Sequence, residues 1–181
     1  MGSELNVPRG VRTTKLAPNR DHRGTFTELF RREWVTGTDS IQWNVVTSHA
    51  GVLRGFHVHP QHTDYLAVVS GKMLLGLRDL RRKSPTFGLA GLYELDAERP
   101  AGWTIPPGVG HGFFFPVPTV TVYSVDRYWS KDDELACRWN DRDLGIDWPV
   151  KDPLLSPRDA AAGTLAQMIE DWERLSAADG K

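Results

Sequence analysis

Short apolar runs interrupted by glycine and proline recur along the middle of the chain. They are rich in Val, Leu, Phe and Tyr, and successive runs begin at a spacing of roughly 8–12 residues. The runs are Gln42–Ser48, Val52–Val58, Tyr65–Ser70, Met73–Arg78, Leu89–Leu95, Trp103–Pro106, Phe113–Pro116 and Val120–Asp126. In the last run, Val120 and Val122 fall on one face and Tyr123 on the other, as in a strand. We therefore predict an all-β barrel or sandwich.

The pattern changes after Pro157. Apolar residues then recur at helical spacing, at Leu165, Met168, Ile169, Trp172 and Leu175. Ser156 stands at the N-cap position and Pro157 at the first helical position. We expect a C-terminal helix within residues 156–181, packed against the outside of a barrel formed by residues 21–155. Residues 1–20 are polar and contain two prolines, which predicts an N-terminal arm or edge strand.

Composition and charge exclude several classes of protein. The 181 residues suit one domain with a short tail. Lys and Arg total 22 against 23 Asp and Glu, which argues against a nucleic-acid-binding protein but permits a local arginine cluster. The single cysteine, Cys137, excludes a disulfide framework and suits a reducing cytoplasm. No apolar run approaches the roughly 18 residues of a membrane span, and residues 1–10 lack the apolar core of a signal peptide.

Three of the six histidines stand beside predicted strands. His57 and His59 are two residues apart, so on a strand both side chains leave the same face. Asp64 opens the next strand, and His111 follows a turn rich in proline and glycine. These four side chains are candidate ligands for a divalent metal ion. The alternative is that His59 and His62 are exposed loop residues with no ligand role.

The same segments resemble the two motifs of the cupin superfamily, which are small jelly-roll barrels. The matching residues are Gly51, His57, His59, Asp64, Gly71, Pro106, Gly108 and His111, with Asp in place of the usual Glu. Pro100 and Phe115 replace the Gly and the Asn of the second motif. The resemblance implies a cupin-type jelly-roll β-barrel. The resemblance is weaker evidence for a metal ion than for the fold, because many cupins have the barrel and lack the ion.

A series of longer motifs runs through residues 20–165. The motifs are Asp21–Glu28, Gln42–Asn44, Gly51–His57, Ser84–Gly88, Ile105–Phe113, Trp139–Asp141 and Leu155–Ala162. Together they resemble the dTDP-4-dehydrorhamnose 3,5-epimerase family, whose members are cupins. The resemblance implies a homodimer that needs no cofactor. It also implies a substrate that is a 4-keto-6-deoxy sugar linked to thymidine diphosphate.

The reaction of that family explains the residue types that the resemblance assigns to catalysis. A C4 ketone acidifies the protons at C3 and C5, so a base removes one and an acid returns a proton to the opposite face. The resemblance makes His57 the base, paired with Asp159, and Tyr123 the acid. Two simpler interpretations stand beside these roles. Tyr123 suits an ordinary alternating strand, and Asp159 has capping-box spacing after Ser156.

The resemblance also supplies a set of substrate-binding residues. Arg23 and Arg54 are expected at the diphosphate, because a planar guanidinium contacts two oxygens at once. Tyr128 and Trp129 are expected to stack on the thymine. Contacts with the base and the sugar are expected from Glu28, Gln42, Asn44 and Glu134, and the set is completed by Phe26, His111 and Arg158.

Two positions depart from the family. Family members have Gln two residues after the catalytic histidine and Lys at the start of the next strand, where this chain has His59 and Asp64. That lysine stabilises the enolate oxygen, a contribution on the order of a few kcal/mol. The same two residues complete the metal motif, so an ion held by His57, His59, Asp64 and His111 is an alternative electrophile. In that case His57 cannot be both a free base and a ligand.

Three functions remain open at this point. The first is an epimerase of a dTDP-4-keto-6-deoxyhexose in deoxysugar biosynthesis, acting at C3, C5 or both. The second is a metal-dependent cupin isomerase, or another enzyme that acts on a nucleotide sugar. The third is a dTDP-sugar-binding relative with weakened catalysis. The first and third take a dTDP-linked 4-keto-6-deoxy sugar as the partner, and the second takes a nucleotide sugar.

Overall fold

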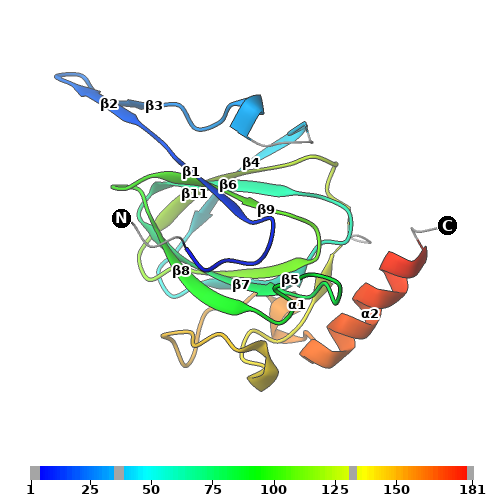
Figure 1. Cartoon of the computed structure of the whole chain (residues 1–181). Coiled ribbons are helices and arrows are strands. Elements are labelled where there is room, and N and C mark those ends of the chain that lie inside the picture. The colour runs from blue at the N-terminus through cyan, green and yellow to red at the C-terminus, as the bar shows by residue number, and fades with distance from the viewer. Residues whose placement is uncertain (1–4, 35–38, 131–133, 179–181) are drawn as a thin grey trace.

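Two five-stranded antiparallel sheets face each other in the computed structural model (Figure 1), which describes residues 5–34, 39–130 and 134–178. The first sheet contains, in order, β1 (Arg12–Lys15), β9 (Ala101–Ile105), β6 (Asp64–Ser70), β11 (Thr119–Val125) and β4 (Gln42–Ser48). The second contains β12 (Leu135–Ala136), β5 (Leu53–Val58), β10 (Val109–Phe114), β7 (Lys72–Asp79) and β8 (Ala90–Asp96). This architecture confirms the predicted all-β jelly roll.

Each of the eight apolar runs overlaps a strand of these two sheets, although the run Phe113–Pro116 extends two residues beyond the end of β10 at Phe114. The largest difference concerns β10, which begins at Val109 rather than at Phe113. Residues 109–112 pair with β7 along their whole length, although two of them are glycines. Gly110 is needed because a Cβ there would lie 2.4 Å from the ring of Phe56. The glycines that suggested a turn therefore permit close packing inside a strand.

The main core fills the space between the two sheets. Its buried residues include Leu66, Val68, Met73, Leu75, Leu77, Leu95, Trp103, Ile105 and Val109. Burial of each large apolar side chain contributes about 1.5–3 kcal/mol. A second cluster lies between the other face of the second sheet and α2 (Leu165–Ala178), and it includes Phe56, Val58, Leu80, Cys137, Leu144, Leu165 and Met168.

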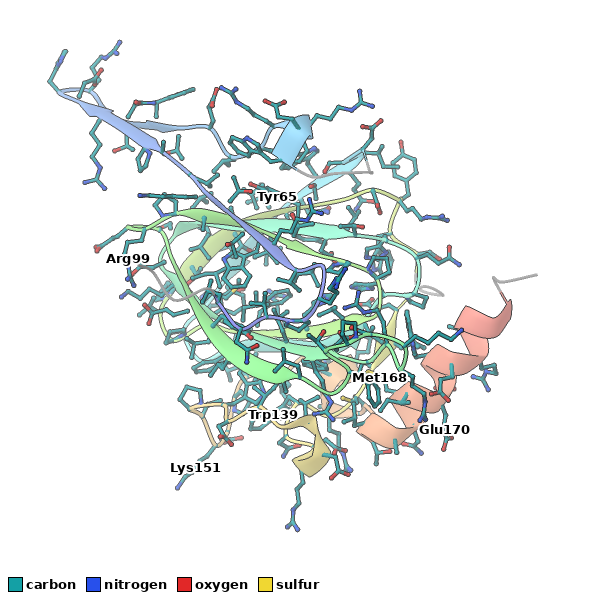
Figure 2. All side chains as sticks on the ribbon, in the orientation of Figure 1. Tyr65, Arg99, Trp139, Lys151, Met168 and Glu170 are labelled. Carbon is teal, nitrogen blue, oxygen red and sulfur yellow. The ribbon has the colours of Figure 1, made fainter. Side chains whose placement is uncertain are left out.

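The C-terminal helix differs from the prediction, because Ser156 and Pro157 begin a separate single turn. This turn is α1 (Pro157–Ala160), in which the side chain of Ser156 accepts a hydrogen bond from the backbone N–H of Asp159. The long helix α2 begins later, where Thr164 and Gln167 exchange side-chain and backbone hydrogen bonds as a capping box. Figure 2 shows Met168 on the side of α2 that faces the barrel and Glu170 on the outer side.

The N-terminal region contributes an edge strand and a hairpin. β1 pairs with β9 at the edge of the first sheet. The next two strands, β2 (Pro18–Asp21) and β3 (Gly24–Thr27), pair only with each other, and the hairpin projects from the barrel in Figure 1. Short 3-10 helices follow at Arg32–Trp34 and Arg142–Leu144. No helix in the described ranges is long and apolar enough to cross a membrane.

Candidate active site

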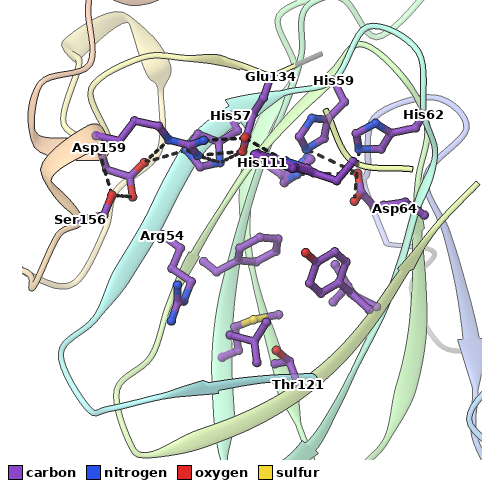
Figure 3. Close-up of a pocket in the computed structure, with 18 of the residues that line it drawn as sticks. Arg54, His57, His59, His62, Asp64, His111, Thr121, Glu134, Ser156 and Asp159 are labelled. Carbon is purple, nitrogen blue, oxygen red and sulfur yellow. Dashed lines mark hydrogen bonds and ion pairs between the residues drawn. The ribbon is translucent and has the colours of Figure 1, made fainter. Parts of the chain in front are cut away.

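A cavity of about 270 Å³ lies between the sheets and takes side chains from both. It brings together polar residues that are distributed over more than a hundred positions of the chain (Figure 3). The polar and charged lining residues are Arg54, His57, His59, His62, Asp64, His111, Thr121, Tyr123, Glu134, Ser156, Arg158 and Asp159. All of the catalytic and metal-ligating candidates named from the sequence therefore line one cavity.

His57 and Asp159 form a buried pair in this cavity. Nε2 of His57, on β5, lies 2.7 Å from Oδ1 of Asp159, on α1. The second carboxylate oxygen of Asp159 accepts a hydrogen bond of 2.8 Å from the hydroxyl of Ser156. Burial acts to raise the pKa of Asp159, but the hydrogen bonds from His57 and Ser156 outweigh it and hold the pKa below its usual value. Asp159 is thus an anion that orients the imidazole.

The other ring nitrogen of His57 faces a second carboxylate. Nδ1 lies 3.1 Å from Oε1 of Glu134. The guanidinium of Arg158 donates to both oxygens of Glu134, to Oε2 at 2.5 Å and to Oε1 at 2.8 Å. Burial acts to raise the pKa of Glu134, and the Arg158 hydrogen bonds with the His57 charge lower it below its usual value. Glu134, expected to contact the base or the sugar, therefore contacts His57 and Arg158 here. Nη2 of Arg158 also lies 2.9 Å from Nε2 of His57. Nε2 either donates a hydrogen bond to Asp159 or accepts one from Arg158, because one ring nitrogen cannot donate and accept at once.

Tyr123 reaches the cavity from the opposite sheet. It lies on β11, and His57 lies on β5. Burial, followed by the negative charges of Asp64 and Glu134, raises the pKa of Tyr123 above its usual value. The phenol therefore keeps its proton at neutral pH, as a proton donor requires.

The expected nucleotide-binding residues are divided between the cavity and its margin. Arg54 and Trp129 line the cavity, and Nε of Arg54 donates to the hydroxyl of Ser48 at 3.1 Å. Gln42 donates to Asn44 at 3.1 Å and accepts from the backbone of Trp129 at 3.0 Å. The buried Nδ2 of Asn44 has no hydrogen-bond partner within the described part of the chain. Tyr128 is 75% exposed and does not line the cavity.

Three further candidates lie on or next to the projecting hairpin and outside the cavity. Arg23 pairs with Asp21 at 2.6 Å, and Glu28 pairs with Arg31 at 2.7 Å. Phe26 is 66% exposed. Because β2 and β3 pair only with each other, nothing within the described chain brings these side chains to the cavity of the same molecule.

Comparison with known proteins identifies the group to which this fold and cavity belong. The model of the family described as dTDP-4-dehydrorhamnose 3,5-epimerase matches residues 6–167. The chain belongs to this family. An enzyme of that name from Neisseria gonorrhoeae is 37% identical over 155 residues, which are 81% of this chain and 47% of the relative, so the chain spans about half of that relative's length.

Two further relatives of the epimerase family match over most of both chains. A dTDP-4-dehydro-6-deoxyglucose 3-epimerase from a Streptomyces species is 38% identical over 156 residues, which are 81% of this chain and 80% of the relative. A crystal structure of the Bacillus anthracis dTDP-4-dehydrorhamnose 3,5-epimerase, with TDP and PPi bound, has a TM-score of 0.83 and 33% identity, and covers 90% of this chain and 98% of its own. The family and the jelly-roll fold inferred from the motifs are thus confirmed.

The structure corrects the set of metal ligands that motif spacing predicts in this chain. His57 is held by Asp159 and Glu134, and the group whose ligand atoms lie within 4.8 Å of one another is His59, His62 and Asp64. His111 adjoins this group through Asp64, at 3.8 Å. His59 and His62 are 7% and 2% exposed, so the alternative of two exposed loop histidines is wrong.

Two cavity residues had no role in the catalytic site expected from the epimerase family. His62 lies in the loop between β5 and β6, and its ring stacks on that of His59 with centroids 4.0 Å apart. Ser156, expected only as a helix cap, also donates to the carboxylate of Asp159. The spacing His59, His62, Asp64 was the available signal for the first of these.

Proposed function

We propose that this chain epimerises a dTDP-4-keto-6-deoxyhexose at C3, C5 or both. The observation that carries the proposal is the placement of His57 and Tyr123 on opposite walls of one cavity, with Asp159 bonded to His57. Epimerisation needs a base on one face of the sugar and an acid on the other. A base on β5 and an acid on β11 meet that requirement.

The proposed reaction is a pair of proton transfers. His57 removes the proton from the carbon next to the C4 ketone, and the bonding electron pair moves to the ketone oxygen to give an enolate. Tyr123 then delivers a proton to the opposite face of that carbon, and the ketone re-forms with inverted configuration. Exchange with solvent restores the proton of Tyr123 and removes the one on His57. Asp159 stays ionised throughout, because its pKa lies below its usual value.

We assign the nucleotide to the part of the same cavity that Arg54 and Trp129 line. Arg54 provides a cation for the diphosphate, and Trp129 provides an indole ring for the thymine. The TDP bound by the Bacillus anthracis relative supports a nucleotide of this class.

We also propose that the chain works as a homodimer in the cytoplasm. The support for the dimer is an apolar outer surface on β4, where Trp43 and Val45 are 44% and 71% exposed, together with the projecting hairpin that carries Phe26. A single buried cysteine, Cys137, suits a reducing compartment.

Deuterium exchange tests the proposed reaction directly. The protein is incubated in deuterated water with dTDP-4-keto-6-deoxyglucose, and NMR locates the incorporated deuterium. We expect exchange at C3, at C5 or at both, and the pattern identifies the inverted carbon. The variant His57→Asn should lose the exchange, and His49→Asn, which changes an exposed histidine, should retain it. A chain that binds dTDP but incorporates no deuterium would be a binding protein.

A further inference from the structure

Four side chains with metal-ligating atoms gather on one side of the cavity (Figure 3). They are His59, His62, Asp64 and His111, and their exposed fractions are 7%, 2%, 6% and 3%. Ligand atoms of the first three all lie within 4.8 Å of one another, and no second group of this kind occurs in residues 5–34, 39–130 and 134–178. The cluster is therefore a buried set of three imidazoles and one carboxylate.

The carboxylate of Asp64 lies among the three imidazoles. Its oxygens are 3.9 Å from Nε2 of His59 and 3.8 Å from Nε2 of both His62 and His111. An N–H···O hydrogen bond is about 2.7–3.2 Å long. Two ligands that each lie about 2.1 Å from a shared tetrahedral ion are about 3.4 Å apart, and ligands at wider angles around an ion are up to about 4.2 Å apart. The three separations therefore fit ligands around an ion better than they fit directly hydrogen-bonded pairs.

His111 is oriented as a metal ligand by its other ring nitrogen. Nδ1 donates to the carbonyl of Val109 at 3.2 Å, so Nε2 carries the lone pair, and Nε2 is the atom that faces Asp64. A neutral imidazole whose second nitrogen bonds to a carbonyl is the usual state of a ligating histidine.

We propose that His59, His62, Asp64 and His111 bind one divalent transition-metal ion. Three imidazoles and a carboxylate suit Zn²⁺ and similar first-row ions rather than Mg²⁺ or Ca²⁺. The set differs from that suggested by the cupin motif, since His62 replaces His57. A metal ion and a free histidine base then coexist in one cavity.

For the proposed epimerisation, on which this role rests, the ion supplies a positive charge. Transfer of a carbon-bound proton to His57 leaves the electron pair on the C4 oxygen as an enolate. A divalent ion beside that oxygen stabilises the developing charge. Asp64 stands where the family resemblance places a lysine, so the ion restores a cation that the sequence lacks. The metal site itself does not depend on the reaction.

Calorimetric titration of the chelator-treated, purified protein with Zn²⁺ tests the site. We expect binding of one equivalent, weakened by about 100-fold or more in His62→Ala and in Asp64→Asn, because loss of a ligand costs more than loss of a residue that only orients one. His49→Ala, the matched control, should bind like the unmodified protein. Visible absorption of the Co²⁺-loaded protein gives a second readout, and circular dichroism reports whether each variant is folded.

The variant His57→Asn separates the two ligand sets. It should bind Zn²⁺ normally while losing deuterium exchange. Loss of Zn²⁺ binding in His57→Asn, normal binding in His62→Ala and Asp64→Asn, or substoichiometric binding by the unmodified protein would overturn the assignment. Absence of deuterium exchange from a protein that binds Zn²⁺ would overturn the proposed function and support the metal site. Exchange unchanged by removal of Zn²⁺ would overturn the catalytic role of the ion alone.

Discussion

The imidazole of His57 is held by residues that lie far from it in the sequence. Asp159 contacts Nε2 and Glu134 contacts Nδ1. Both nitrogens can donate only in the protonated ring, whereas a ring that removes a proton from carbon must present a lone pair. In the proposed reaction, with Asp159 kept on Nε2, Glu134 therefore has to release Nδ1, and Arg158 already donates to both oxygens of Glu134 and can hold it.

Substitutions of Asp159 and Ser156 should separate orientation from capping. Asp159→Asn keeps the shape but cannot hold an imidazolium, so the rate of deuterium exchange should fall by about 10²–10⁴-fold. Ser156→Ala removes the cap of α1 and one bond to Asp159, which should lower the free energy of unfolding by about 1 kcal/mol and the rate much less. Urea unfolding and exchange kinetics measure both effects. Equal losses of rate in the two variants would contradict this division.

The guanidinium of Arg54 should determine affinity for the nucleotide rather than the chemistry. Arg54→Ala should weaken dTDP binding by about 10–100-fold, because one charge-assisted contact with the diphosphate is lost. Calorimetry with dTDP checks this expectation. Arg12→Ala, on the edge strand β1, is a matched control that should bind normally. Unchanged affinity in Arg54→Ala would remove the residue from the diphosphate site.

At the scale of elements, short capped segments decide where the chain turns around the barrel. α1 is a single turn capped by Ser156, and it places Asp159 beside β5. The connection between β7 and β8 is organised in a similar way by Asp79, which accepts hydrogen bonds from Arg81, Ser84 and Thr86. Both segments use one buried carboxylate to hold an irregular backbone.

The buried carboxylate of Asp79 makes the stability of the connection between β7 and β8 depend on pH. Burial acts to raise its pKa, but the bonds from Arg81, Ser84 and Thr86 lower it to about 2, from 3.8. Because the folded pKa is the lower one, the stabilisation is complete above the unfolded value and is lost as the pH falls from about 4 to about 2. The shift corresponds to about 2 kcal/mol.

Urea unfolding of Asp79→Asn measures this contribution. The variant should lose about 2–4 kcal/mol of unfolding free energy at pH 6, since the amide cannot replace the bidentate Arg81 contact. The difference in unfolding free energy between the two proteins should be smaller at pH 3, because ionised Asp79 then contributes only part of its stabilisation. Asp143→Asn, in the 3-10 helix Arg142–Leu144, is an exposed control. A difference that does not depend on pH would contradict the account.

At the scale of the whole molecule, the outer face of the first sheet is the surface best suited to pair with a second copy. Val45 of β4 lies opposite Val122 of β11, which lies opposite Ala67 of β6, so one apolar row crosses three strands. Ala67 is 1% exposed, so the accessible part of this row lies on β4 and β11. Val45 is 71% exposed, and Val69, further along β6, is 39% exposed. Burial of this row against its copy would remove apolar surface from water.

The dimer is tested by light scattering after size exclusion. We expect a mass twice the 20.3 kDa of one chain, and a mass near that of a single chain for Val45→Asp, because a carboxylate in an apolar interface is strongly unfavourable. Phe87→Asp, which changes an apolar residue that is 47% exposed on the connection between β7 and β8, should stay dimeric. A monomeric unmodified protein would contradict the prediction.

The sequence by itself determined the strands, the family and most of the cavity. Alternation at residues 119–126 is a local property, and it separated Tyr123 from Val120 and Val122. The structure shows that the face with Tyr123 lines the cavity. The motifs around His57 and Asp159 identified a pair that is 102 residues apart in the chain. Capping at Ser156 is visible in the sequence. The capping-box spacing of Thr164 and Gln167, which marks the separate start of α2 at Leu165, is visible there too, but our prediction took Ser156 as the start of one continuous helix.

Only the tertiary structure decided which side chains share each contact. Spacing placed His57 with His59 and Asp64, but side chains on one strand face need not reach one point. The bond to Asp159 draws His57 toward α1, and the loop after β5 brings His62 into the cluster instead. Such contacts depend on how distant segments pack, and pairwise distances across a barrel are not encoded in any local pattern of residues.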